Sequence, residues 1–132
     1  MKNLFTIHAL VTCLFGLALL LVPATLLAAY GITPDPGGAV VARLLGGAFI
    51  GLGVVAWFAR GAAPSDALRA FILGVTVVST LGCIVSIHGV LSSASNAVGW
   101  LNVVLYGFFA VGFGALATGK APSGRAPLTA HP

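Results

Sequence analysis

The stretch that decides the fold spans residues 67–91 and reads ALRAFILGVTVVSTLGCIVSIHGVL. Arg69, in the first turn, is its only Lys, Arg, Asp or Glu residue. A helix needs roughly 20 predominantly apolar residues to cross the hydrocarbon core of a bilayer. The stretch is therefore predicted to be a transmembrane helix. Three similar apolar runs, residues 4–29, 39–59 and 97–118, are predicted to form three more.

The composition of the whole chain supports this interpretation. Only 6% of the 132 residues are charged and 59% are hydrophobic, whereas about a quarter of the residues in a soluble domain are charged. Lipid must therefore cover most of the outer surface. The length leaves room for four spanning helices and no soluble domain, so residues 1–118 are predicted to form one membrane domain. Residues 119–132, rich in Pro, Gly and Ala, are predicted to be a disordered cytoplasmic tail.

Short connections between the four runs imply that neighbouring helices are antiparallel. A membrane barrel would show strands of about ten residues with alternating polarity, and that pattern is absent. The predicted fold class is therefore all-α, an integral membrane bundle of four antiparallel transmembrane helices. A signal peptide is an alternative for the first run, but its poor cleavage positions favour an uncleaved helix.

The distribution of basic residues predicts the orientation. Lys2, Arg60, Arg69, Lys120 and Arg125 lie at the start, around the middle loop and in the tail. The positive-inside rule then places both termini and the middle loop in the cytoplasm. These residues are scattered and form no basic patch, so a nucleic-acid partner is not expected.

Three polar residues inside the apolar runs are candidate binding residues. By depth, Arg43, His88 and Asn102 all fall in the outer half of the bundle, where they could line one cavity for an anion, a headgroup or another ligand. The alternative is structural: Arg43 snorkels to the outer interface, and the others are interhelical hydrogen-bonding groups. His8 is expected to be interfacial near the cytoplasmic end of the first helix. Tyr30 is expected in an aromatic belt at the outer interface.

Small residues suggest where helices approach one another. Gly47 and Gly51 form a small-xxx-small pair, which permits close helix contact. Gly107, in the last helix, is a further candidate for helix packing.

Residues for catalysis or metal binding are scarce. The chain has no Glu, and Asp35 and Asp66 both fall in predicted loops. No Cys/His spacing indicates a metal site. The sequence therefore predicts no catalytic residue, metal or cofactor. Cys13 and Cys83 are interpreted as small buried residues, with an oxidoreductase subunit using one of them as the weakest alternative.

The segment from Ala42 to Gly53, ARLLGGAFIGLG, resembles the small bacterial four-helix membrane proteins of the DoxX-like group. Pro23 and the turn at Tyr30 and Gly31 fit this resemblance. Many members of the group have no known activity, and some resemble accessory subunits of quinol-oxidising complexes. The resemblance implies a multi-pass protein of the bacterial inner membrane, with Arg43 as a contact for a partner, a lipid or a quinone.

Two functions remain open from the sequence. The first is a non-enzymatic accessory or interaction subunit that packs against membrane lipid, a membrane-protein partner or a second copy of itself. The alternative is a binder or carrier of a lipophilic small molecule, such as a lipid or quinone, in an outer-side pocket.

Overall fold

Five helices make up the computed structural model, which describes residues 1–119. They are α1 (Lys2–Leu21), α2 (Pro23–Ala29), α3 (Pro36–Ala59), α4 (Asp66–Leu91) and α5 (Gly99–Thr118), and no strand occurs in this part of the chain. All but α2 are long and apolar enough to cross a membrane. The predicted all-α membrane fold is thus confirmed, whereas the predicted tail lies outside the described residues except for Gly119.

A break at Val22 divides the first apolar run into α1 and α2. The prediction of one helix over residues 4–29 is wrong at this point, because Val22 leaves helical geometry with φ −133° and ψ 53°. Pro23 is the cause: it has no N–H to donate, and its ring clashes with the carbonyl four residues earlier in a continuous helix. Proline is instead favoured in the first turn of a new helix, where it begins α2.

The connections use well-defined capping groups. After α2, the Ile32 N–H donates to the Leu27 carbonyl (3.0 Å) and the Gly31 N–H to the Ala28 carbonyl (2.9 Å). These two bonds form a Schellman cap, with Gly31 at the required positive φ of 75°. The Asp35 carboxylate caps α3, and the Ser65 hydroxyl caps α4.

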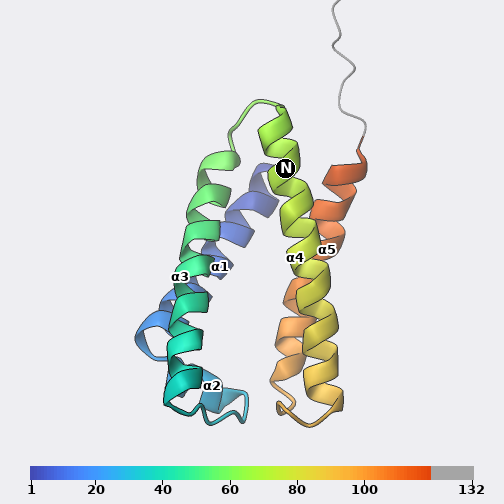
Figure 1. The fold of residues 1–132 in the computed structure, drawn as a ribbon. Coiled ribbons are helices and arrows are strands. Elements are labelled where there is room, and N and C mark those ends of the chain that lie inside the picture. The colour runs from blue at the N-terminus through green and yellow to red at the C-terminus, as the bar shows by residue number, and fades with distance from the viewer. Residues whose placement is uncertain (120–132) are drawn as a thin grey trace, which may run out of the picture.

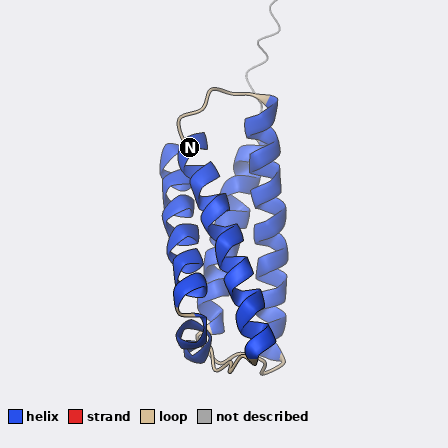
Figure 2. Ribbon diagram, turned by 60° about the vertical axis from the view of Figure 1, so that its left-hand side comes forward, coloured by secondary structure: helices blue, strands red, loops and turns tan. Residues whose placement is uncertain are grey.

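The helices associate as two pairs. In Figure 1 the chain descends through α1, ascends through α3, descends through α4 and ascends through α5. The helix α3 packs along α1, and α4 packs along α5, whereas contacts between the two pairs are few. Figure 2, turned by 60°, shows the four long helices side by side with loops at both ends.

Glycines set the close approach of α1 and α3. A Cβ added to Gly16 would lie 2.7 Å from the Gly46 carbonyl oxygen, and one added to Gly46 would lie 2.6 Å from the Gly16 carbonyl oxygen. A Cβ at Gly53 would collide with Thr12 and Cys13. Only glycine therefore permits this backbone contact.

The predicted small-residue pair, Gly47 and Gly51, is not at this contact: nothing lies within 4 Å of a Cβ added to either residue. Gly107 of α5 does face a neighbouring helix, since a Cβ added there would lie 3.9 Å from the Cys83 sulfur of α4. One residue along a helix turns the side chain by about 100°. Gly46 therefore faces α1, while Gly47 faces outward.

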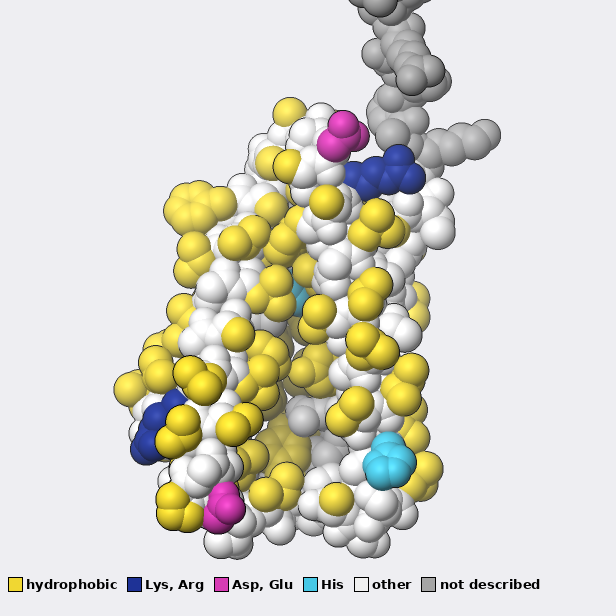
Figure 3. All heavy atoms as spheres, viewed as in Figure 1, with side chains coloured by type: hydrophobic (Ala, Val, Ile, Leu, Met, Phe, Trp, Pro, Cys, Tyr) yellow, Lys and Arg dark blue, Asp and Glu magenta, His cyan; other side chains and the backbone are white. Residues whose placement is uncertain are grey.

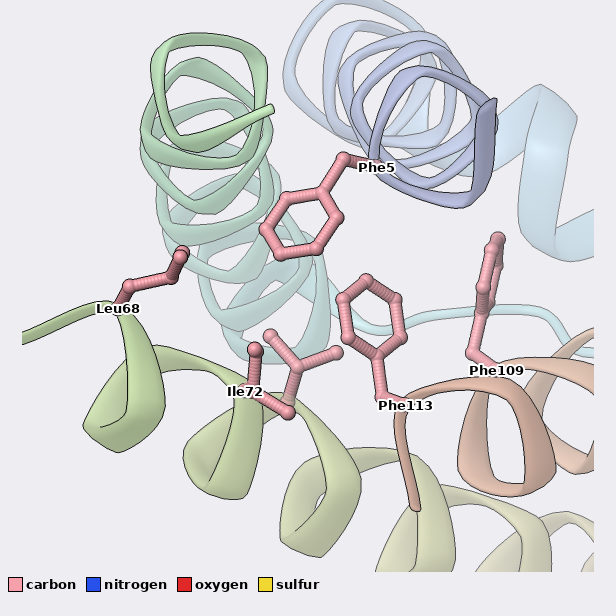
Figure 4. Close-up of a cluster of buried hydrophobic side chains, with 6 residues drawn as sticks. Phe5, Leu68, Ile72, Phe109 and Phe113 are labelled. Atoms are coloured by element: carbon pink, nitrogen blue, oxygen red, sulfur yellow. The ribbon is translucent and has the colours of Figure 1, made fainter. Parts of the chain in front are cut away.

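An aromatic cluster joins the two pairs at one end of the bundle. Its members are buried residues of α1, α4 and α5: Phe5, Leu68, Ile72, Val75, Phe109 and Phe113. Phe5 of α1 points at Phe113 of α5 (Figure 4), with 5.1 Å between ring centroids and an angle of 64° between the rings. This edge-to-face arrangement is a favoured aromatic geometry.

Candidate binding cavity between the helix pairs

A cavity of about 320 Å³ lies between the α1–α3 pair and the α4–α5 pair. It exists because the pairs touch each other mainly at their ends, leaving a space along the middle. All five helices contribute to its lining. The space-filling view shows this face hollowed between α3 and α4, with a histidine side chain visible at depth (Figure 3).

The cavity opens on the lipid-facing surface between α3 and α4. Leu45 of α3 and Val85 of α4 both line it, yet they are 46% and 69% exposed. Val78 of α4 likewise lines the cavity and is 46% exposed. Since these helices are long enough to span the bilayer, a molecule dissolved in the bilayer can reach the cavity sideways.

The lining is mainly apolar and contains no Lys, Arg, Asp or Glu among the described residues. Its polar side chains lie at two levels. One level, beside the aromatic cluster, consists of His8, Thr12 and Ser79. The other, toward the opposite end, includes Tyr30, Ser86, Asn102 and Tyr106. Ser79 and Ser86 are separated by two turns of α4, about 10 Å along its axis.

Three hydrogen bonds close the end of the cavity around Tyr30; we call this group the clasp. The Tyr30 hydroxyl donates to Asn102 Oδ1 (2.9 Å), the Asn96 side-chain amide donates to the Ala29 carbonyl (2.9 Å), and the Asn96 backbone N–H donates to the Tyr30 carbonyl (2.9 Å). Each bond links the α2 region to the start of α5. The clasp therefore holds the two pairs together opposite the aromatic cluster.

The Tyr30 side chain belongs to this clasp and is buried. Its predicted place in an aromatic belt is therefore wrong. Burial raises the pKa of Tyr30 above the ordinary value of 10.0, because an apolar environment disfavours the phenolate.

His8 is the polar group at the other end of the cavity. Its side chain is only 3% exposed, and Phe109 and Phe113 pack edge-on against its ring at centroid distances of 4.7 and 5.1 Å. Its Nδ1 atom is buried and has no hydrogen-bond partner within residues 1–119. The expectation that His8 is interfacial is wrong, because the face of α1 that carries it also carries buried Phe5 and Thr12.

Of the three candidate binding residues predicted from the sequence, the structure places only one in the cavity. Asn102 lines the cavity, whereas Arg43 and His88 are exposed and do not. Arg43 follows Ala42, which is buried against α1, and so points away from the pair. On α4, Ser86 and Gly89 line the cavity, and the intervening His88 is rotated off that face.

Metal binding finds no support in the described part of the chain. No group of three or more His, Cys, Asp or Glu residues lies close enough to hold an ion. Cys13 and Cys83 are free and half-buried. The Cys83 thiol donates a weak bond to the Val103 carbonyl at 3.7 Å, which ties α4 to α5.

No protein-family model, curated protein or solved structure matches the chain. Its function is therefore inferred from the cavity.

Proposed function

We propose that this protein binds a lipophilic small molecule in the cavity between its two helix pairs. The observation that carries the proposal is the opening of an apolar cavity toward lipid between α3 and α4. Small-molecule sites are typically concave, mostly apolar and supplied with a few converging polar groups, with volumes from about 300 Å³ upward. The cavity has each of these properties.

Purification in native-lipid particles, followed by mass spectrometry of extracted small molecules, tests the proposal. The protein is expected to retain one class of lipophilic compound at a fixed molar ratio. Ser86→Phe fills the cavity and is expected to remove that compound. The matched control is Thr80→Phe: Thr80 is exposed on the same helix and, like Ser86, donates only to the carbonyl four residues earlier.

Retention of the same compounds by both variants, in the proportions of the surrounding bilayer, would contradict a specific cavity ligand.

The membrane placement belongs to the same proposal. We assign the chain to the bacterial inner membrane with both termini in the cytoplasm, on the basis of Lys2, Arg60 and Arg69 and of the segment similar to the DoxX-like group. The His8 end of the cavity then faces the cytoplasm, and the clasp lies near the outer surface.

An accessory or interaction subunit is the second candidate function. The observation that favours it is the open face of α3 at Gly47 and Gly51, where nothing in the described chain comes within 4 Å of an added Cβ. Two small residues four apart let a partner helix approach closely. Gly47→Leu is then expected to abolish co-purification of a stoichiometric membrane-protein partner while leaving the cavity ligand bound. A partner retained by this variant would exclude the α3 face as the contact.

A further inference from the structure

His8 Nδ1 is the one buried side-chain nitrogen or oxygen that lacks a hydrogen-bond partner in the described part of the chain. A buried polar group without a partner costs free energy, so native structures usually satisfy it. The residue also lines the cavity. The His8 imidazole is therefore the side chain at this end of the cavity whose hydrogen-bonding capacity the protein leaves unused.

At the clasp end, Tyr30, Asn102 and Ser86 already have hydrogen-bond partners, whereas the Tyr106 hydroxyl has none among the described residues. The Tyr30 hydroxyl already donates to Asn102, and the Ser86 hydroxyl donates to the Gly82 carbonyl. At the His8 end, the Thr12 hydroxyl donates to the His8 backbone carbonyl (2.7 Å). The imidazole itself remains unsatisfied, and its Nδ1 is the one unpartnered side-chain nitrogen or oxygen that is fully buried among the described residues.

The absence of charged side chains in the described lining restricts which head group a ligand can place at the His8 end. No charged side chain of the described residues lines the cavity, and both acidic residues, Asp35 and Asp66, lie at the beginnings of α3 and α4. A phosphate, carboxylate or ammonium group would lose its hydration there without gaining a counter-ion. A hydroxyl group fits, because a neutral imidazole has one donor and one acceptor nitrogen and a hydroxyl can serve either.

We infer that the ligand is an uncharged lipid alcohol, bound with its hydroxyl group at His8 and its apolar chain directed toward the opening between α3 and α4. Ser79, 2% exposed and on the same level of the cavity, offers a second hydroxyl contact. This inference rests on the proposed lipophilic cavity site and names the class of molecule and the residue that recognises it.

Binding of three probes to the full-length protein in detergent tests the inference. The probes are dodecanol, dodecane and dodecanoate, which share one apolar chain and differ in the head. Dodecanol is expected to bind about tenfold more tightly than either of the others, the worth of one hydrogen bond in a dry site. His8→Phe, which keeps a flat ring in the aromatic cluster, is expected to reduce the preference over dodecane to about one.

His88→Phe is the matched control, because His88 is exposed and outside the cavity. It is expected to keep the tenfold preference.

A measurement on the unmodified protein avoids any effect of substitution on folding. In protein labelled with ¹⁵N at histidine, dodecanol is expected to shift the imidazole resonances of His8 and not those of His88, whereas dodecane shifts neither.

The outcomes separate the two proposals. Equal binding of dodecanol and dodecane, with no shift at His8, would overturn the role of His8 and leave the lipophilic cavity intact. Tighter binding of dodecanoate would overturn the restriction to uncharged heads. If no probe binds, the cavity is not a ligand site and both proposals fail.

Discussion

At the residue scale, the hydrogen bond between Tyr30 and Asn102 connects positions 72 residues apart in the chain. Both side chains also line the cavity. One pair thus closes the end of the cavity and ties the α2 region to α5. Asn102 is a candidate that the sequence identified by its polarity within an apolar run, whereas its partner is known only from the fold.

The strength of this bond can be measured by a double-mutant cycle. Tyr30→Phe and Asn102→Ala are each expected to lower the free energy of unfolding in detergent, with a coupling of about 1 kcal/mol between them. A coupling near zero would mean that the two side chains do not interact. Tyr106→Phe with Asn102→Ala provides a comparison pair from the same cavity, for which no mutual hydrogen bond is found.

The titration of Tyr30 gives a second prediction at this scale. Tyr106→Phe leaves Tyr30 as the only tyrosine, since the chain has two, and ultraviolet absorbance then reports its ionisation alone. Its pKa is expected above 10.0, because burial disfavours the phenolate. The contribution of the neutral Tyr30 side chain to the free energy of unfolding is full below pH 10.0 and is lost as the pH rises through the folded-state pKa. Titration at or below pH 10.0 would show that the clasp is open in solution.

At the element scale, helix rotation decides the role of each residue. On α3, Gly46 contacts α1 and the adjacent Gly47 faces outward. On α4, Ser86 lines the cavity and His88 does not. The apolar character of a membrane helix is nearly uniform around its axis, since lipid and protein interior are both apolar, so the sequence carries little information about which face is inward.

Alanine substitution of the two adjacent glycines tests this rotation. Gly46→Ala is expected to cost about 1–3 kcal/mol of stability, because its Cβ would collide with the backbone at Gly16 and Leu20. Gly47→Ala is expected to be neutral or to stabilise by up to about 1 kcal/mol, since alanine is the better helix former. Thermal unfolding in detergent measures both. The reverse order would mean that α3 is rotated by about one residue.

At the scale of the whole molecule, two helix pairs are held together at their ends by different chemistry. The aromatic cluster joins them at one end, and the hydrogen bonds of the clasp join them at the other. Between these ends the pairs remain apart and leave the cavity. The lipid-facing opening thus follows from the arrangement of the pairs.

Phe113 tests the aromatic end of this arrangement. It is fully buried between α1 and α4, so Phe113→Ala is expected to cost about 3–5 kcal/mol in the free energy of unfolding. Phe108→Ala is the control on the same helix. Phe108 is half exposed, and its loss is expected to cost no more than about 0.5 kcal/mol. Equal losses from both variants would argue that the pairs are not joined through this cluster.

The proposed orientation is open to a labelling test. After Cys13 and Cys83 are replaced by alanine, single cysteines are placed at Ala62, between α3 and α4, and at Ser93, between α4 and α5. A membrane-impermeant maleimide applied to intact spheroplasts is expected to label Ser93→Cys and to leave Ala62→Cys unlabelled until the cells are lysed. Labelling in the opposite order would invert the assigned topology.

The sequence by itself determined the number of the spanning helices, the positions of the loops between them and the scarcity of charged groups. These follow from local composition, because hydrocarbon thickness sets how many consecutive apolar residues a spanning helix needs. The prediction of one helix over residues 4–29 missed the break at Pro23, although proline interrupts helical hydrogen bonding by its local chemistry alone.

Only the tertiary structure decided which residues meet. It brought His8 to Phe109 and Phe113, paired Tyr30 with Asn102, and left Arg43 and His88 outside the cavity. These outcomes depend on how each helix is rotated and which helix it packs against. Steric fit at positions such as Gly16, Gly46 and Gly53 sets that rotation, and such fit arises between segments distant in the chain.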